Sequence, residues 1–348
     1  MNHADTRRTG TFVIAGLLML GIILSATNAA EFRSDWRSSG DRQWAGASYW
    51  ANRLQDWRVQ DGRLQCIHAG RNRNVHLLPC QVSPDSRLTM QVTVSRPHEA
   101  FRGWVGFEFA SRGNNMDEYR HNAIFGDGIR AAMWHGGRLV LGKNAASRGT
   151  WSERVRLRLS LAPEGNKCAA TLTAMKPDGT EIATVSDTFP ADRVSGNLVL
   201  VCHGTRAKPS HGTPVTSFSN WTVRGSNLRG GPEQNWGPIL WTQYTVDEKV
   251  LKLSAQFPPL GPQDSRTATL EVKKDGQWKK IDTARIDPLA RLALFREEGW
   301  NADEEVPYRV TYRLDGKTHQ SPGVVRKNPT DRSEVEVAAF TGKKDYGF

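Results

Sequence analysis

The side chains of this chain that could bind a ligand are aromatic, acidic and basic residues that recur along its predicted strands. Val105, Phe107 and Phe109 alternate with other residues, so if they face a core, Trp104 and Glu108 face the opposite side of the same sheet. Pyranose rings stack on tryptophan, and charged side chains hold sugar hydroxyl groups. The predicted sugar-binding set consists of Trp104, Glu108, Tyr119, Arg120, His121, Asp127, Trp134, Arg154, Arg156 and Arg158.

These residues also have an ordinary structural interpretation. Aromatic residues of β-sandwiches usually pack in the core, and a stripe such as Arg154, Arg156 and Arg158 is usually a solvated face. The segment His203-Gly204-Thr205 and His211 lie in a stretch rich in Gly, Pro and Ser, without the helical spacing of a histidine metal pair. We expect a surface loop there.

Four cysteines give an even count, which permits disulfides in a chain that leaves the cytoplasm. Cys66 and Cys80 fall in neighbouring predicted strands and form the candidate pair. Three connectivities exist, and a set of buried free thiols is an equal alternative. Because no Cys-x-x-Cys spacing occurs, a zinc site is not expected.

The formal net charge of +11 raises the hypothesis of a nucleic-acid partner. Basic residues are scattered over both halves of the chain, however, without an arginine-rich tail or a recognition-helix pattern. We therefore expect no nucleic-acid partner. Glycans or anionic phosphorylated material of the cell envelope fit a scattered basic surface better.

Residues 1–30 have the features of a signal peptide. Two arginines precede an apolar run over residues 12–24, and small residues follow it. The run holds about 13 residues, against the roughly 20 that a membrane-spanning helix needs. We expect cleavage after Ala29 or Ala30, no stable membrane span afterwards, and export to the periplasm, the cell surface or the medium. An uncleaved anchor is the alternative.

The remainder of the chain has the pattern of an all-β protein. Apolar residues alternate with polar ones in Arg154–Leu161 and in Leu88–Val94, which is typical of strands with one buried face. Short strands separated by turn residues predict two-sheet sandwiches. A polar stretch rich in Gly, Pro and Asn over residues 226–236 is the predicted linker between domains at 31–225 and 237–328.

Two segments of the first domain carry a family resemblance. Trp57–Leu64 reads Trp-Arg-Val-Gln-Asp-Gly-Arg-Leu, and Phe218–Gly225 reads Phe-Ser-Asn-Trp-Thr-Val-Arg-Gly. Together they resemble the opening and closing strands of concanavalin A-like or laminin G-like jelly rolls. The resemblance implies that these two segments lie side by side.

The second domain resembles a fibronectin type III-like or immunoglobulin-like sandwich. Lys274-Asp275-Gly276 and Leu314–Lys317 have the composition of hairpin turns, because Gly tolerates the positive φ that such turns need. Apolar and basic residues alternate in Tyr308–Arg313, which predicts a strand with one buried face.

The most specific resemblance concerns the end of the chain. Gly237–Thr242, Ser321–Pro329 and the predicted strand Val335–Phe340 are similar to segments that lead into the catalytic domain of secreted, alkaline phosphatase D-like metallophosphatases. The resemblance implies that residues 329–348 are the first strand and loop of a truncated α/β metallophosphoesterase domain. In calcineurin-like phosphoesterases an Asp-x-His follows this strand and binds metal. Asp345 is not followed by that histidine here, so the resemblance implies only a vestigial metal ligand at this position.

These observations predict an exported accessory region of a phosphatase D-like metallophosphoesterase, with a role in binding or positioning. The chain alone is expected to contain no catalytic residue and no cofactor, since divalent metals would belong to a complete catalytic domain. The alternative is a free-standing carbohydrate-binding or adhesion module of the cell envelope. A glycoside hydrolase is a third class, but Glu108 has no evident carboxylate partner in the sequence.

Overall fold

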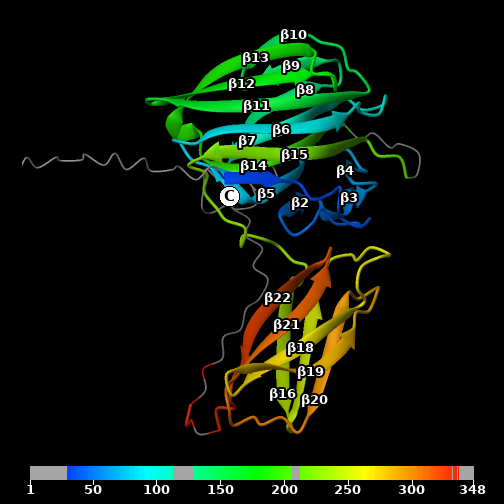
Figure 1. The fold of residues 1–348 in the computed structure, drawn as a ribbon, viewed down its shortest axis with the longest axis vertical. Coiled ribbons are helices and arrows are strands. Elements are labelled where there is room, and N and C mark those ends of the chain that lie inside the picture. The colour runs from blue at the N-terminus through cyan, green and yellow to red at the C-terminus, as the bar shows by residue number, and fades with distance from the viewer. Residues whose placement is uncertain (1–29, 113–127, 206–211, 331, 335, 337–348) are drawn as a thin grey trace, which may run out of the picture.

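The computed structural model describes residues 30–112, 128–205, 212–330, 332–334 and 336 (Figure 1). Strands β1 to β15 form one body, and strands β16 to β22 form a second body beside it. Several sequence predictions fall outside the described residues: positions 1–29 of the signal peptide, Tyr119, Arg120, His121, Asp127, His211, and residues 337–348 with Asp345.

The first body is a sandwich of two antiparallel sheets. The eight-stranded sheet runs in the order β13 (Glu181–Pro190), β12 (Lys167–Met175), β11 (Arg154–Glu164), β6 (Arg87–Ser95), β15 (Thr216–Ser226), β4 (Arg63–Cys66) and β3 (Trp57–Gln60), with β1 (Ala30–Arg33) also paired to β15. The seven-stranded sheet runs in the order β10 (Asn144–Arg148), β9 (Arg138–Leu141), β8 (Ile129–Trp134), β7 (Gly103–Ser111), β14 (Gly196–Gly204), β5 (Arg73–Val82) and β2 (Tyr49–Asn52).

The core of the first sandwich lies between the two sheets, because each strand turns one apolar row inward. Val155 and Leu157 of β11 are fully buried, as their alternation predicts. Val105, Phe107 and Phe109 of β7 belong to the same hydrophobic cluster and come from the opposite sheet. The outward row of β11 in the eight-stranded sheet is partly solvated, whereas the outward row of β7 in the seven-stranded sheet is buried as well.

The two segments that were expected to open and close the jelly roll do lie side by side. Leu64 on β4 pairs with Phe218 on β15. The first strand uses the other end of β15, where Phe32 pairs with Val223. The early and late parts of the sandwich are thus joined by backbone hydrogen bonds in one sheet.

The second body is a smaller sandwich. Its sheets are β16 (Trp241–Asp247), β17 (Val250–Gln256) and β20 (Leu292–Glu298), facing β19 (Gln277–Arg285), β18 (Thr267–Lys274), β21 (Val306–Leu314) and β22 (Lys317–Val325). Tyr308, Val310 and Tyr312 are buried, as predicted. Asp315 and Gly316 form a two-residue hairpin turn with φ values of 48° and 77°, the left-handed region that such turns require.

The two sandwiches contact each other through the segment between β1 and β2. Trp44, which precedes β2, is buried in the hydrophobic cluster of the second sandwich, and Ala47 and Trp236 pack against that cluster. Arg42 forms ion pairs with Asp264 and Asp315 of the second sandwich. The contact therefore combines an apolar anchor with a charged one.

The all-β fold class is confirmed: the described residues form antiparallel sheets joined by turns and short 3-10 segments. No helix among them is long and apolar enough to cross a membrane.

Candidate ligand-binding site

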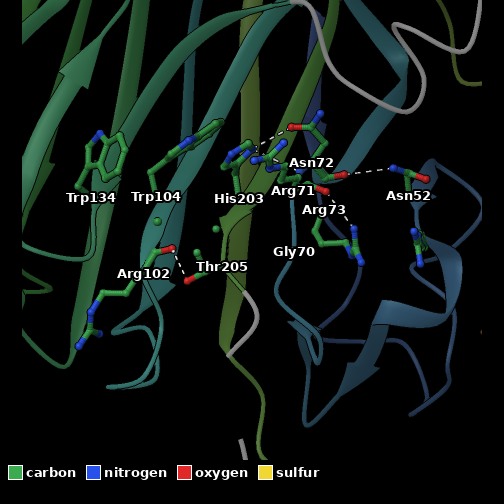
Figure 2. Close-up of a pocket in the computed structure, with 13 residues that line it drawn as sticks. Asn52, Gly70, Arg71, Asn72, Arg73, Arg102, Trp104, Trp134, His203 and Thr205 are labelled. Atoms are coloured by element: carbon green, nitrogen blue, oxygen red, sulfur yellow. Dashed lines mark hydrogen bonds between the residues drawn. The ribbon is translucent and has the colours of Figure 1, made fainter. Parts of the chain in front are cut away.

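A cavity of about 740 Å³ opens on the outer face of the seven-stranded sheet (Figure 2). Its volume lies within the roughly 300–1,000 Å³ of small-ligand pockets. The lining residues are Asn52, Arg53, Gly70, Arg71, Asn72, Arg73, Arg102, Gly103, Trp104, Trp134, His203, Gly204 and Thr205.

A row of three rings crosses the cavity on neighbouring strands (Figure 2). Trp104 on β7 pairs with Trp134 on β8 and with His203 on β14, so all three side chains stand on the same face. The rings of Trp104 and His203 stack, with centroids 5.2 Å apart and planes 12° apart. The guanidinium carbon of Arg130 lies 4.7 Å from the centroid of Trp104.

The three rings differ in exposure, and this decides what each can do. Trp104 is only 4% exposed, so its ring mainly supports its neighbours. Trp134 and His203 are half-buried and keep surface toward the cavity. The structure thus provides a platform whose outer rings are accessible to a ligand.

Close packing of β7 against β14 holds this platform in place. A Cβ atom on Gly103 would approach the carbonyl oxygen of His203 to 2.0 Å. A side chain at this position would therefore push the two strands apart and displace the ring row.

His203 is oriented by a hydrogen bond from its ring. Its Nδ1 lies 2.8 Å from Oδ1 of Asn72; in the tautomer with Nδ1 protonated, this oxygen accepts the hydrogen bond and Nε2 is left for other partners. Burial, together with the charges of Arg130 and Arg71, lowers the pKa of His203. The imidazole is therefore neutral at neutral pH, and a nearby anion would favour its charged form.

Arginines are the charged residues of the cavity lining. Arg73 donates from Nε to Oδ2 of Asp56 at 2.5 Å, so its charge is compensated. Arg53, Arg71 and Arg102 are exposed and have no ion pair with any residue that the structure describes. The described residues of the lining include no Asp or Glu.

Further polar side chains lie on the same face of the sheet, along β5 and β7. Asn74 is 1% exposed, and neither its Oδ1 nor its Nδ2 has a hydrogen-bond partner. His76 is also buried, and burial lowers its pKa to about 4. Glu108 accepts a hydrogen bond from the backbone N–H of Gly128. This face therefore holds polar groups well beyond the cavity rim.

The structure brings together part of the predicted sugar-binding set. Trp104 and Trp134 both line the cavity, whereas Glu108 lies further along β7 and does not line it. The arginine stripe is on a different surface, because Arg154, Arg156 and Arg158 belong to β11 in the eight-stranded sheet. Those three arginines therefore cannot contact the same small ligand as the tryptophans.

The sequence analysis missed the other half of the cavity. His203 was expected in a surface loop, but it lies in β14, within hydrogen-bonding distance of Asn72. Arg53, Arg71 and Arg102 each lie beside the ends of strands, and no motif links them. The available signal was the position of His203 at the end of an apolar run, which would have extended the strand to it.

The predicted Cys66–Cys80 pair is not formed. Cys66 lies in β4 and Cys80 in β5, which belong to different sheets rather than to neighbouring strands, and both thiols are free and buried. The thiol of Cys202 lies next to that of Cys66. Burial raises the pKa of Cys66 well above its usual range. The described residues contain no cluster of three or more His, Cys, Asp or Glu that could hold a metal.

Comparison with known proteins assigns no family to this chain. No family model matches it, and no curated protein matches it. A winged bean acidic lectin complexed with methyl-α-D-galactose covers 58% of this chain and 99% of its own, at 8% identity and a TM-score of 0.37. The FN1-FN3 domains of chicken CNTN1 cover 74% of this chain and 95% of their own, at 7% identity and a TM-score of 0.19. Both TM-scores are low, and neither likeness supports a function for this chain.

Proposed function

We infer that this chain is an exported carbohydrate-binding or adhesion module and that its ligand occupies the cavity on the seven-stranded sheet. The observation that carries this inference is the ring row Trp134–Trp104–His203, which stands on a rigid sheet and is bordered by side chains that can donate hydrogen bonds. Sugar rings present apolar faces that stack on aromatic side chains, and their hydroxyl groups need such polar partners.

A binding role fits the site better than a catalytic one. Glycoside hydrolysis needs two carboxyl groups on either side of the scissile bond. The described lining of the cavity offers none, and Glu108 is engaged with the backbone N–H of Gly128.

The phosphatase interpretation has less support. It rests largely on residues near the end of the chain, of which 337–348 lie outside the described part. No family model matches the chain. The cavity and its ring row lie within the described residues and support a binding role, so this is the function we propose.

Binding to a glycan array, followed by calorimetry with the best oligosaccharide, tests the proposal. Trp134→Ala should weaken binding by about tenfold, because one lost stacking contact corresponds to roughly 1.4 kcal/mol. Trp241→Ala is the matched control, since Trp241 is 44% exposed on the second sandwich. The proposal is wrong if no glycan binds, or if the two variants bind the ligand equally well.

A further inference from the structure

The charges that surround the ring row identify the kind of glycan. We propose that the cavity binds an anionic saccharide, one that carries carboxylate or sulfate groups, and that Arg53, Arg71 and Arg102 bind those groups. This inference rests on the proposed function and narrows it to a ligand class.

The charge balance of the cavity is the first support. Among the described residues, four arginines and no acidic residue line it, and Asp56 compensates Arg73. The side chains of Arg53 and Arg71 form no hydrogen bond or ion pair with another described residue. Beside a neutral sugar these guanidinium groups would remain hydrated, whereas an oxyanion would receive charge-assisted hydrogen bonds from them.

The placement of the arginines is the second support. Arg71 lies beside His203 and Asn72 at one end of the ring row, and Arg102 lies near the opposite end, by Trp104 and Trp134 (Figure 2). The side chains come from separate loops that converge on one face. Acidic groups on successive sugar units could therefore be held on both sides of a stacked ring.

The chemistry of the side chains is the third support. A guanidinium group donates two parallel hydrogen bonds, which match the oxygens of a carboxylate or a sulfate. Arg102 uses Nη1 on the carbonyl oxygens of Glu99 and Phe101, which orients its remaining donors. His203 adds a further positive charge when an anion draws a proton to it.

Matched pairs of oligosaccharides test the proposal by calorimetry with the full chain. Oligogalacturonate is compared with its neutral methyl ester, and a sulfated galactan oligosaccharide with its desulfated form. Each anionic member, or the one with the preferred acid group, should bind at least about tenfold more tightly than its neutral partner. The pair that responds identifies carboxylate or sulfate as the group bound.

Paired variants separate the cavity from the general positive charge of the protein. Arg53→Ala/Arg71→Ala should weaken binding of the anionic member by about tenfold or more. Arg154→Ala/Arg158→Ala removes the same charge from exposed positions on the other sheet and should change affinity less than about twofold. All four side chains are exposed, and circular dichroism and melting temperature verify that both variants fold.

Each alternative result has a distinct meaning. Equal binding of neutral and anionic members would overturn the anionic ligand but leave the carbohydrate module. Equal losses in the two double variants would also overturn it, because general charge would then explain the affinity. Absence of binding to every saccharide would overturn both proposals. Tighter binding of a single-stranded oligonucleotide, with the same dependence on Arg53 and Arg71, would replace the glycan by a polyphosphate ligand.

Discussion

The guanidinium group of Arg42 donates two hydrogen bonds to the carboxylate of Asp315, at 2.8 Å from Nη1 and 2.7 Å from Nη2, across the boundary between the two sandwiches. Nη2 also lies 3.0 Å from Oδ1 of Asp264. The Arg42 side chain is only 2% exposed, so solvent screens these contacts weakly. Arg42 thus fixes the turn at Asp315 of one sandwich against the other.

Arg42→Ala should lower the free energy of unfolding by about 3–5 kcal/mol, because it leaves two carboxylates of the boundary without their cation. Urea denaturation of the full chain measures this. The control is Arg224→Ala, whose pair with Glu31 is exposed at 62% and 51% and should contribute less than about 1 kcal/mol. Equal effects of the two substitutions would show that the boundary contact contributes no more than a surface pair.

The Arg42 contact also illustrates what local sequence can and cannot predict. The Asp315-Gly316 turn was predicted from its residue types, since these alone tolerate the turn's positive φ values. Nothing in the sequence linked Asp315 to Arg42, because tertiary packing brings them together across 273 positions. For the same reason Trp44 gave no sign that it packs into the second sandwich.

Local sequence likewise predicted one part of the candidate site and missed another. Alternation along β7 correctly put Trp104 on the face opposite Phe107, because the side-chain period of a strand is local. The arginine stripe of β11 has equally clear alternation, yet the pattern does not say which sheet a strand joins. Arg71 comes near His203 through long-range contacts of its two neighbours: the bridge between Gly70 and His203, and the hydrogen bond between Asn72 and His203.

The four cysteines should remain unreactive toward Ellman's reagent in the folded protein at about pH 8, because the thiolate is the reactive species. Burial raises the pKa of Cys80 to about 11 and raises the pKa of Cys66 well above its usual range. In urea, all four thiols should react, and Cys80→Ser should leave three. An intact mass lower by two hydrogens, with two thiols missing in urea, would reveal a disulfide instead.

His76 should make the protein acid-sensitive. Its folded-state pKa of about 4 lies below the ordinary value of 6.5, so the unfolded chain takes up a proton that the folded chain excludes. The contribution of neutral His76 to stability is fully present above about pH 6.5. The free energy of unfolding should fall by about 3 kcal/mol as the pH drops to about 4. Urea midpoints across this range measure the loss.

His76→Gln should remove most of that acid dependence. The free energy of unfolding of this variant should be lower than that of the wild type at neutral pH and should change little with pH. The matched control is His135→Gln, which changes an exposed imidazole in the turn that follows β8 and should keep the wild-type pH profile. An unchanged slope in His76→Gln would mean that other groups cause the acid sensitivity.

His203 should make binding of an anionic saccharide tighter in acid. In the free protein, burial and the charges of Arg130 and Arg71 lower its pKa below 6.5, whereas a bound oxyanion would raise it. Because the complex then holds the proton more tightly than the free protein, affinity should rise as the pH falls through the pKa of the complex, and level off below that of the free protein. We expect a gain of about three- to tenfold between about pH 8 and about pH 5. Calorimetry with a sulfated oligosaccharide, whose charge is constant over this range, measures the gain.

His203→Gln keeps a polar side chain at the site and should abolish the pH dependence of binding. A pH dependence that persists in this variant would assign the proton to another group.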